Sequence, residues 1–161
     1  MNSLLLVIDV QNDFINDETK ELPKKIYDLI NENKFSNVVF TRFINSENSI
    51  FFKKLNYSGC LSEIGKQIVI ENEKNYKIID KKGYTAYTQE LIDYVNENKI
   101  EKIYLCGIDT ESCVLKTAFD LFENEHDVYV LKDYCASTLG LERHNNAIEI
   151  LKRNIGKQNV I

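Results

Sequence analysis

Short apolar runs alternate with stretches of helical spacing along the whole chain. The apolar runs predict strands at residues 3–9, 37–42, 77–80, 102–107, 127–132 and 158–161. The helical spacing predicts helices at residues 22–34, 88–98, 112–124 and 140–153, the first opened by Pro23. Strands that alternate with helices are typical of a parallel sheet with helices on both faces. We therefore predict one α/β domain over residues 1–161, a three-layer α/β/α sandwich around a six-stranded parallel sheet, with residues 43–76 as its least regular part.

A cysteine lies where the fourth predicted strand gives way to a helix. Thr110 and Ser112 are good helix caps, and Cys113 follows them. The first turn of a helix has unpaired N–H groups and a positive dipole end, which stabilise a thiolate and a nearby oxyanion. Cys113 is therefore a candidate nucleophile, although free cysteine is often a small buried filler and position alone does not decide between the two.

Two other predicted strands end in charged residues. The run before Asp9 is a fully apolar strand, and the strand at 77–80 is followed by Lys81 and Lys82. In an open α/β sheet, ligands bind outside the carboxyl ends of the strands. We therefore expect Asp9, a lysine and Cys113 to converge at one edge of the sheet.

Three motifs carry a resemblance to a known family. They are Asp-x-Gln-x-Asp-Phe at 9–14, Lys-x-x-Tyr-Ser-Ala-Phe at 81–87 with Thr85 and Tyr87 in place of Ser and Phe, and Gly-x-x-Thr-x-x-Cys-Val at 107–114. On these motifs nearly the whole chain resembles the isochorismatase-like cysteine hydrolase family. The spacing from Tyr84 matches the family lysine to Lys81. Lys82 stays a competitor, because adjacent strand residues point to opposite faces and a shift of one residue would exchange them.

The resemblance implies a Rossmann-like strand order of 3-2-1-4-5-6 and an Asp9, Lys81 and Cys113 triad that hydrolyses a small carboxamide or related C–N bond through an acyl-enzyme. In these roles Asp9 is the general base and then the acid, and Lys81 holds Asp9 and favours the thiolate. The resemblance also implies a cis peptide between Ile108 and Asp109, with the backbone N–H groups of Asp109 and Cys113 as oxyanion donors. It implies a homo-oligomer as well.

Several residues near the predicted strand ends are candidates for contacts with a substrate. Phe14, Phe43, Tyr84 and Tyr134 are candidates for an aromatic pocket wall, although aromatic residues in such positions more often belong to the core. Arg42 is a candidate partner for a substrate carboxylate, with an ordinary ion pair as its alternative. Metal-binding nicotinamidases of the family carry an Asp and two histidines after the second strand, and this chain has none of them there. We predict no metal and no cofactor.

Charge and cysteine content narrow the function classes further. A net charge of −5 argues against binding to nucleic acid or to an anionic membrane. No apolar run has the length of a transmembrane helix, and Asp9 interrupts the first strand too early for a signal peptide. The four cysteines form no C-x-x-C pair, which fits a reducing compartment. We therefore expect a cytoplasmic protein whose partner is a small-molecule amide.

A second class of function uses the same fold without hydrolysis. In it the protein is a binding or scaffold protein, or a thiol redox sensor with a low-pKa Cys113. A sensor usually has a resolving cysteine nearby, and Cys106 lies inside the preceding strand instead. The combined motifs favour the hydrolase.

Overall fold

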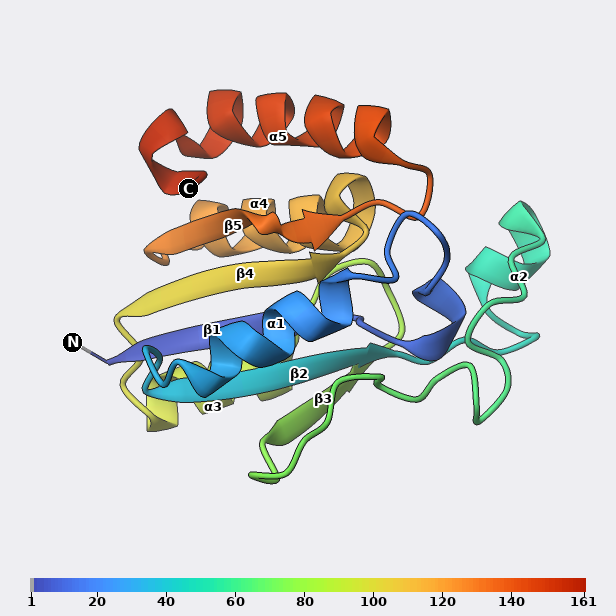
Figure 1. The fold of residues 1–161 in the computed structure, drawn as a ribbon, viewed down its shortest axis with the longest axis horizontal. Helices are drawn as coiled ribbons and strands as arrows, with labels where there is room; N and C mark the ends of the chain where they lie inside the picture. The colour runs from blue at the N-terminus through green and yellow to red at the C-terminus, as the bar shows by residue number, and fades with distance from the viewer. Residues whose placement is uncertain (1) are drawn as a thin grey trace.

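The computed structural model describes residues 2–161 and has a parallel five-stranded sheet in the order β3-β2-β1-β4-β5 (Figure 1). The strands are β1 (Ser3–Ile8), β2 (Asn37–Phe43), β3 (Lys77–Lys81), β4 (Lys102–Ile108) and β5 (Val128–Ala136). β1 lies in the centre and every one of its residues is buried. A continuous apolar run is typical of a strand covered on both faces, which explains why this segment forms the middle of the sheet.

The prediction of a sixth strand was wrong. Val160 forms only an isolated parallel bridge with Val130, and the Ile161 N–H donates to the Val130 carbonyl at 2.9 Å. The reason lies in the preceding segment, where Gly156 adopts a positive φ of 97° and residues Lys157–Asn159 form a 3-10 turn. Only the last two residues of this sequence therefore reach the edge of β5.

Helices cover both faces of the sheet. They are α1 (Leu22–Asn31), α3 (Gln89–Glu97), α4 (Leu115–Glu123) and α5 (Leu141–Ile155). The short α2 (Ile50–Leu55) lies beyond the carboxyl ends of the strands, where its Phe51 packs with Phe43 and Cys60 (Figure 1). Side chains of α3, α4 and α5 pack with Leu4, Leu6 and Ile8 in one core cluster, whereas α1 packs with Leu5 and Val7 in the other. Alternate residues of β1 thus face opposite layers, as the two-residue period of a strand requires. Among the described residues, no helix is long and apolar enough to cross a membrane.

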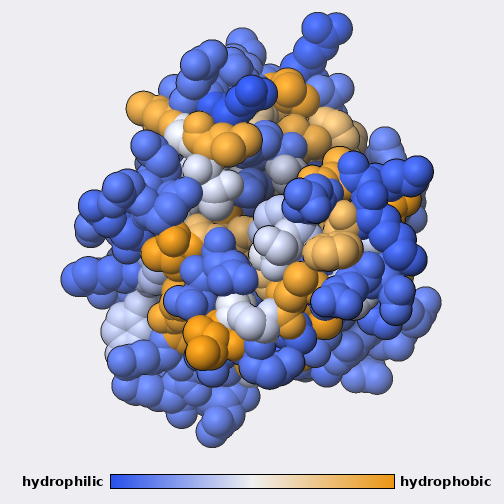
Figure 2. Space-filling model, turned by 90° about the vertical axis from the view of Figure 1, so that its right-hand side faces the viewer, coloured by the Kyte–Doolittle hydropathy of each residue, from blue (hydrophilic) through white to orange (hydrophobic). Residues whose placement is uncertain are grey.

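The carboxyl ends of the strands meet at one edge, the side of the molecule that Figure 2 faces. There β1 and β4 come close at Gly107, which is paired in register with Ile8 and has a φ of +125°. A Cβ at Gly107 would lie 2.1 Å from the Ile8 carbonyl oxygen. Only glycine fits this approach, which brings the segments after β1 and β4 together.

We predict that Gly107→Ala destabilises the fold, because the added methyl group collides with backbone and the residue is left in a strained conformation. The expected loss in free energy of unfolding is about 2 to 4 kcal/mol, measured by urea denaturation. Gly83→Ala is the matched control, since a Cβ at Gly83 meets nothing within 4 Å. Equal stability of the two variants would contradict the packing described here.

Candidate active site

Asp9, Lys81 and Cys113 come together below the carboxyl edge of the sheet. The Lys81 Nζ lies 2.6 Å from the Asp9 Oδ2 and 3.6 Å from the Cys113 Sγ. The side chains of Asp9 and Lys81 are 0% and 1% exposed, and Cys113 as a residue is 8% exposed. The ammonium group therefore lies between a carboxylate and a thiol in a site largely closed to water.

Asp9 is held by the neighbouring strand. It follows β1 directly and adopts a positive φ of 49°, which turns the chain away from the strand direction. The Thr41 hydroxyl in β2 donates to the Asp9 Oδ1 at 2.7 Å and accepts from the Asp9 N–H at 3.2 Å. The second carboxylate oxygen, Oδ2, is buried and has no hydrogen-bond partner among the described residues apart from its ion pair with Lys81. Thr41 therefore fixes the Asp9 Oδ1, while the Asp9 Oδ2 keeps capacity to accept a proton.

Of the two neighbouring lysines, Lys81 is the buried one. It is the last residue of β3, whereas Lys82 is exposed. Its ammonium also donates to the carbonyl oxygens of Gly83 at 2.8 Å and Tyr84 at 3.0 Å. Burial lowers the pKa of Lys81, but the negative charge of Asp9 and the Cys113 sulfur outweigh it, so that the pKa is raised. Lys81 thus remains a cation, held by carboxylate and carbonyl oxygens.

Cys113 lies in a single turn of π-helix, Thr110–Val114, that leads into α4. Burial raises the pKa of the Cys113 thiol well above its ordinary value, and the Asp9 charge adds to this, while Lys81 acts in the opposite direction. The sequence predicted a thiolate favoured by the helix start. In the folded site desolvation dominates, so the resting form is the thiol.

Asp109 stands between β4 and the cysteine turn. The Ile108–Asp109 peptide bond is cis, as the resemblance implied. The Thr138 N–H donates to the Asp109 Oδ1 at 2.6 Å, and the Thr138 hydroxyl donates to Oδ2 at 3.1 Å. Burial raises the pKa of Asp109 to about 6, although the hydrogen bonds from Thr138 lower it. A fixed carboxylate that titrates near neutral pH therefore lies next to the nucleophile candidate.

The cysteine turn is also tied to α5 and to the segment after β5. The Thr110 hydroxyl is 2.8 Å from the His144 Nδ1, and the Ser137 hydroxyl donates to the Glu111 Oε1 at 2.6 Å. His144 of α5 thus supports the turn and does not line the cavity over Cys113. These contacts hold the turn that carries Cys113 on its side away from the cavity.

A cavity of about 310 Å³ opens above Cys113. Its apolar lining is Phe14, Phe43, Phe51 and Leu55, and its polar lining is Asp13, Asn16, Tyr57, Tyr84, Asp109, Ser112 and Thr138. Phe51 packs edge-on against both Phe43 and Tyr84, with ring centroids 5.1 and 5.0 Å apart. Three of the aromatic residues that the sequence proposed, Phe14, Phe43 and Tyr84, therefore share one cavity with the cysteine.

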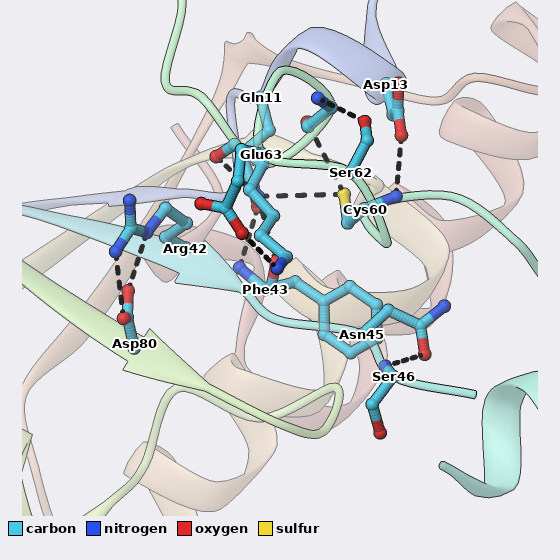
Figure 3. Close-up of polar contacts among 12 residues, drawn as sticks. Gln11, Asp13, Arg42, Phe43, Asn45, Ser46, Cys60, Ser62, Glu63 and Asp80 are labelled. Carbon is cyan, nitrogen blue, oxygen red and sulfur yellow. Dashed lines mark hydrogen bonds and ion pairs between the residues drawn. The ribbon is translucent and has the colours of Figure 1, made fainter. Parts of the chain in front are cut away.

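The other two proposed substrate contacts lie elsewhere. The Arg42 Nε and Nη2 donate to the two carboxylate oxygens of Asp80 at 2.7 and 2.9 Å, on neighbouring strands (Figure 3). Tyr134 packs against the core cluster of α1, beyond the cavity lining. Successive strand residues point to opposite faces, so Arg42 points away from the side of the sheet to which Phe43 and Lys81 belong. Arg42 and Tyr134 therefore do not belong to the proposed substrate site.

No metal centre accompanies these residues in the described part of the chain: residues 2–161 contain no group of three or more His, Cys, Asp or Glu side chains placed to hold a metal ion. After β2, where the sequence lacks the family's metal ligands, Asn45 has a structural role. Its amide donates to the carbonyl oxygens of Tyr57 at 3.0 Å and Gly59 at 2.9 Å. The residues present do not fit a metal site of that kind.

A model of the isochorismatase domain matches residues 3–158. The chain belongs to the isochorismatase family. Isochorismatase family protein 2A of Dictyostelium discoideum is 42% identical over 65 residues, which cover 39% of this chain and 32% of the relative. A probable inactive nicotinamidase of Arabidopsis thaliana is 22% identical over 178 residues, covering 96% and 90%. The crystal structure of Pyrococcus horikoshii pyrazinamidase in complex with zinc has a TM-score of 0.85 at 24% identity, covering 99% of this chain and 97% of that one.

These similarities show the family and the fold. The chain spans only 32%, 66% and 44% of the length of the first three curated relatives that it matches. Family and fold therefore do not by themselves fix the activity of this isochorismatase-family chain, which depends on its own site.

Sequence reasoning did not assign a role to Gln11, the middle residue of the first motif. Its amide donates to the carbonyl oxygens of Phe43 and Lys66, each at 3.0 Å, and its Oε1 accepts from the Phe43 N–H at 2.7 Å (Figure 3). Asp13 of the same motif accepts from the Cys60 N–H at 2.6 Å. Gln11 thus ties the loop after residue 60 to the end of β2, and Asp13 ties the same loop to the segment after β1. Their fixed place in the motif was the only signal in the sequence.

We predict that Asp109→Asn raises the free energy of unfolding at pH 7. Because the folded-state pKa of about 6 lies above the ordinary carboxyl value, the native state binds more protons than the unfolded chain between about pH 4 and 6. The ionised Asp109 therefore costs stability at pH 7, on the order of 3 kcal/mol, and that cost falls with pH and vanishes below about pH 4.

The measurement is urea unfolding of both proteins at pH 7 and at pH 4.5. The asparagine variant is expected to be the more stable at pH 7, with the difference shrinking at pH 4.5. A difference that stays constant over this range would show that Asp109 is not the group described.

Proposed function

We propose that this isochorismatase-family chain is a cysteine hydrolase that cleaves a small carboxamide or related C–N bond through an acyl-enzyme. The observation that carries the proposal is the buried Lys81 ammonium, 2.6 Å from the Asp9 carboxylate and 3.6 Å from the sulfur of Cys113, which itself lines a cavity. A buried ion pair beside a nucleophile is costly to maintain and contributes little to stability. Its placement is explained by chemistry more readily than by folding.

The proposed reaction begins with the thiol. As the Cys113 sulfur attacks the carbonyl carbon, Asp9 takes the thiol proton, and the carbonyl oxygen becomes an oxyanion that accepts from the N–H groups of Asp109 and Cys113. Asp9 then gives the proton to the departing amine as the C–N bond breaks, which leaves a thioester on Cys113. Water, deprotonated by Asp9, attacks the thioester, and its collapse releases the acid and restores the thiol.

The geometry supports a different task for each charged residue. The Asp9 Oδ2 has only its ion pair with Lys81, which leaves lone-pair capacity for the thiol proton. Lys81 lowers the pKa of Cys113 against the larger effect of burial, and it also keeps Asp9 in place. Since the resting thiol is neutral, proton transfer accompanies attack and does not precede it.

The specific alternative is a non-catalytic role. One relative over nearly the whole chain is named as a probable inactive nicotinamidase, so loss of activity on this fold has a precedent by name. A redox-sensing role is less well supported, because Cys106 is fully buried and its pKa is raised by burial. A scaffold would not need a buried Asp9 and Lys81 pair beside a thiol.

Two further expectations accompany the proposal. We infer a cytoplasmic location from the four free cysteines, which suit a reducing compartment. We also carry forward from the family resemblance the expectation of a homo-oligomer with a small-molecule amide as its partner and no nucleic acid.

We predict that Cys113→Ala abolishes ammonia release from the carboxamide, urea or N-carbamoyl compound that the wild-type protein hydrolyses, by at least about 1,000-fold in kcat, because no thioester forms. Enzyme-coupled ammonia detection over a panel of such compounds measures this. Cys135→Ala is the matched control, as this buried thiol lies in β5 outside the cavity. Release that survives in Cys113→Ala would exclude the proposed mechanism, and failure of the whole panel would favour the non-catalytic role.

We predict that Lys81→Ala slows the alkylation of Cys113 by iodoacetamide at pH 7 by about tenfold or more, because the variant loses the cation that lowers the pKa of the thiol. Lys82→Ala is the control, since Lys82 is the exposed neighbour. Peptide mass spectrometry locates the labelled cysteine. Equal labelling rates in the two variants would remove Lys81 from the proposed site.

A further inference from the structure

The cavity above Cys113 carries carboxylates and no basic side chain. Within residues 2–161 its lining includes Asp13 and Asp109 but no lysine, arginine or histidine. The two cations that the sequence proposed for this site are already engaged: Lys81 pairs with Asp9 at 2.6 Å, and Arg42 binds Asp80 through two hydrogen bonds. A carboxylate or phosphate on a ligand would meet carboxylates in this cavity without a cation of the lining to balance it.

The carboxylates of Asp13 and Asp109 differ in how many of their acceptor positions are used by hydrogen bonds within the protein. The Asp13 Oδ2 accepts from the Cys60 N–H at 2.6 Å, and the Asp13 N–H donates to the Gly65 carbonyl, so this residue joins two loops. Both contacts to the Asp109 carboxylate come from one side, from Thr138. A carboxylate has about four acceptor positions, so Asp109 keeps acceptor capacity for a ligand in the cavity that it lines.

The charge on Asp109 is not balanced by a cation of the protein. Its hydrogen bonds come from neutral Thr138, and among the described residues no salt bridge includes it. Burial raises its pKa to about 6, and the negative charges of Asp109 and Asp13 add to burial in raising the pKa of Tyr57 across the cavity. A partly buried and unpaired charge is costly, and a positive or N–H-bearing ligand group would lower that cost.

We propose that Asp109 is the specificity-determining residue of this site. Its carboxylate accepts hydrogen bonds from an ammonium or similar N–H group of the substrate, while the aromatic walls hold the apolar part. The site therefore prefers cationic amides, accepts neutral ones, and rejects amides that carry a carboxylate or phosphate. The inference rests on the proposed amidohydrolase function and adds the charge class of its substrate. The binding test does not depend on turnover.

The test compares three benzamides that differ in one meta substituent: aminomethyl, which is cationic at pH 7.5, hydroxymethyl, which is neutral, and carboxylate. Binding of each is measured by calorimetry to Cys113→Ala protein, which cannot turn them over. The same measurement is made with Asp109→Asn added, which keeps an acceptor and a donor for Thr138. Asp127→Asn is added in its place as the control with the same change in net charge, since Asp127 precedes β5 at the opposite edge and its side chain is 46% exposed.

We expect the cationic amide to bind at least tenfold more tightly than the carboxylate. Asp109→Asn should reduce that ratio by tenfold or more, and Asp127→Asn should leave it within about twofold. A ratio near one, a ratio that survives in Asp109→Asn, an equal fall in both variants, or no binding of the cationic amide would each overturn the proposal.

The same three compounds separate this proposal from the proposed function when they are given to the wild-type protein. Charge-selective binding that depends on Asp109, without ammonia release from any amide, would uphold the selectivity and reject the hydrolase. Ammonia release that requires Cys113 but has the same ranking in Asp109→Asn would uphold the hydrolase and reject the role of Asp109.

Discussion

The buried ion pair between Asp9 and Lys81 is the interaction around which the edge of this sheet is organised. Both side chains are almost completely removed from water, so each depends on the other and on a few fixed partners: the Thr41 hydroxyl for Asp9, and the carbonyl oxygens of Gly83 and Tyr84 for Lys81. Removing one partner would leave an uncompensated buried charge, which typically costs several kcal/mol. The ends of β1, β2 and β3 are therefore coupled through one pair of charges.

That pair also sets the state of the thiol beside it. Burial makes the Cys113 thiolate unfavourable, and the Asp9 charge adds to the effect, while the Lys81 ammonium opposes both. A permanently charged thiolate would need much stronger compensation than one lysine shared with a carboxylate. The arrangement suits a neutral thiol whose proton has one short route to a carboxylate oxygen with spare capacity.

Above the thiol, the walls of the cavity combine aromatic surface with negative charge. Phe43, Phe51 and Tyr84 form a packed aromatic group, and Asp109 presents a carboxylate fixed by Thr138. In our proposal such a cavity discriminates by charge more than by shape, because an unpaired charge in a desolvated site changes affinity more than a small change in apolar contact. The chemistry of the triad and the choice of ligand are thus separate properties of one site.

The sequence by itself determined five strands and their helices, since buried parallel strands appear as continuous apolar runs. Motif spacing pointed to Asp9, Cys113 and one of two neighbouring lysines, and the tertiary structure shows that Lys81 is the buried one. The sequence could not distinguish a sixth strand from a bridge, because a positive-φ turn at Gly156 decides how far the last residues follow β5. It could not orient Arg42 or Tyr134, as side-chain direction depends on register. Only the tertiary structure brought Phe51 and Tyr57 from the irregular segment over Cys113, and only burial decided that Cys113 rests as a thiol.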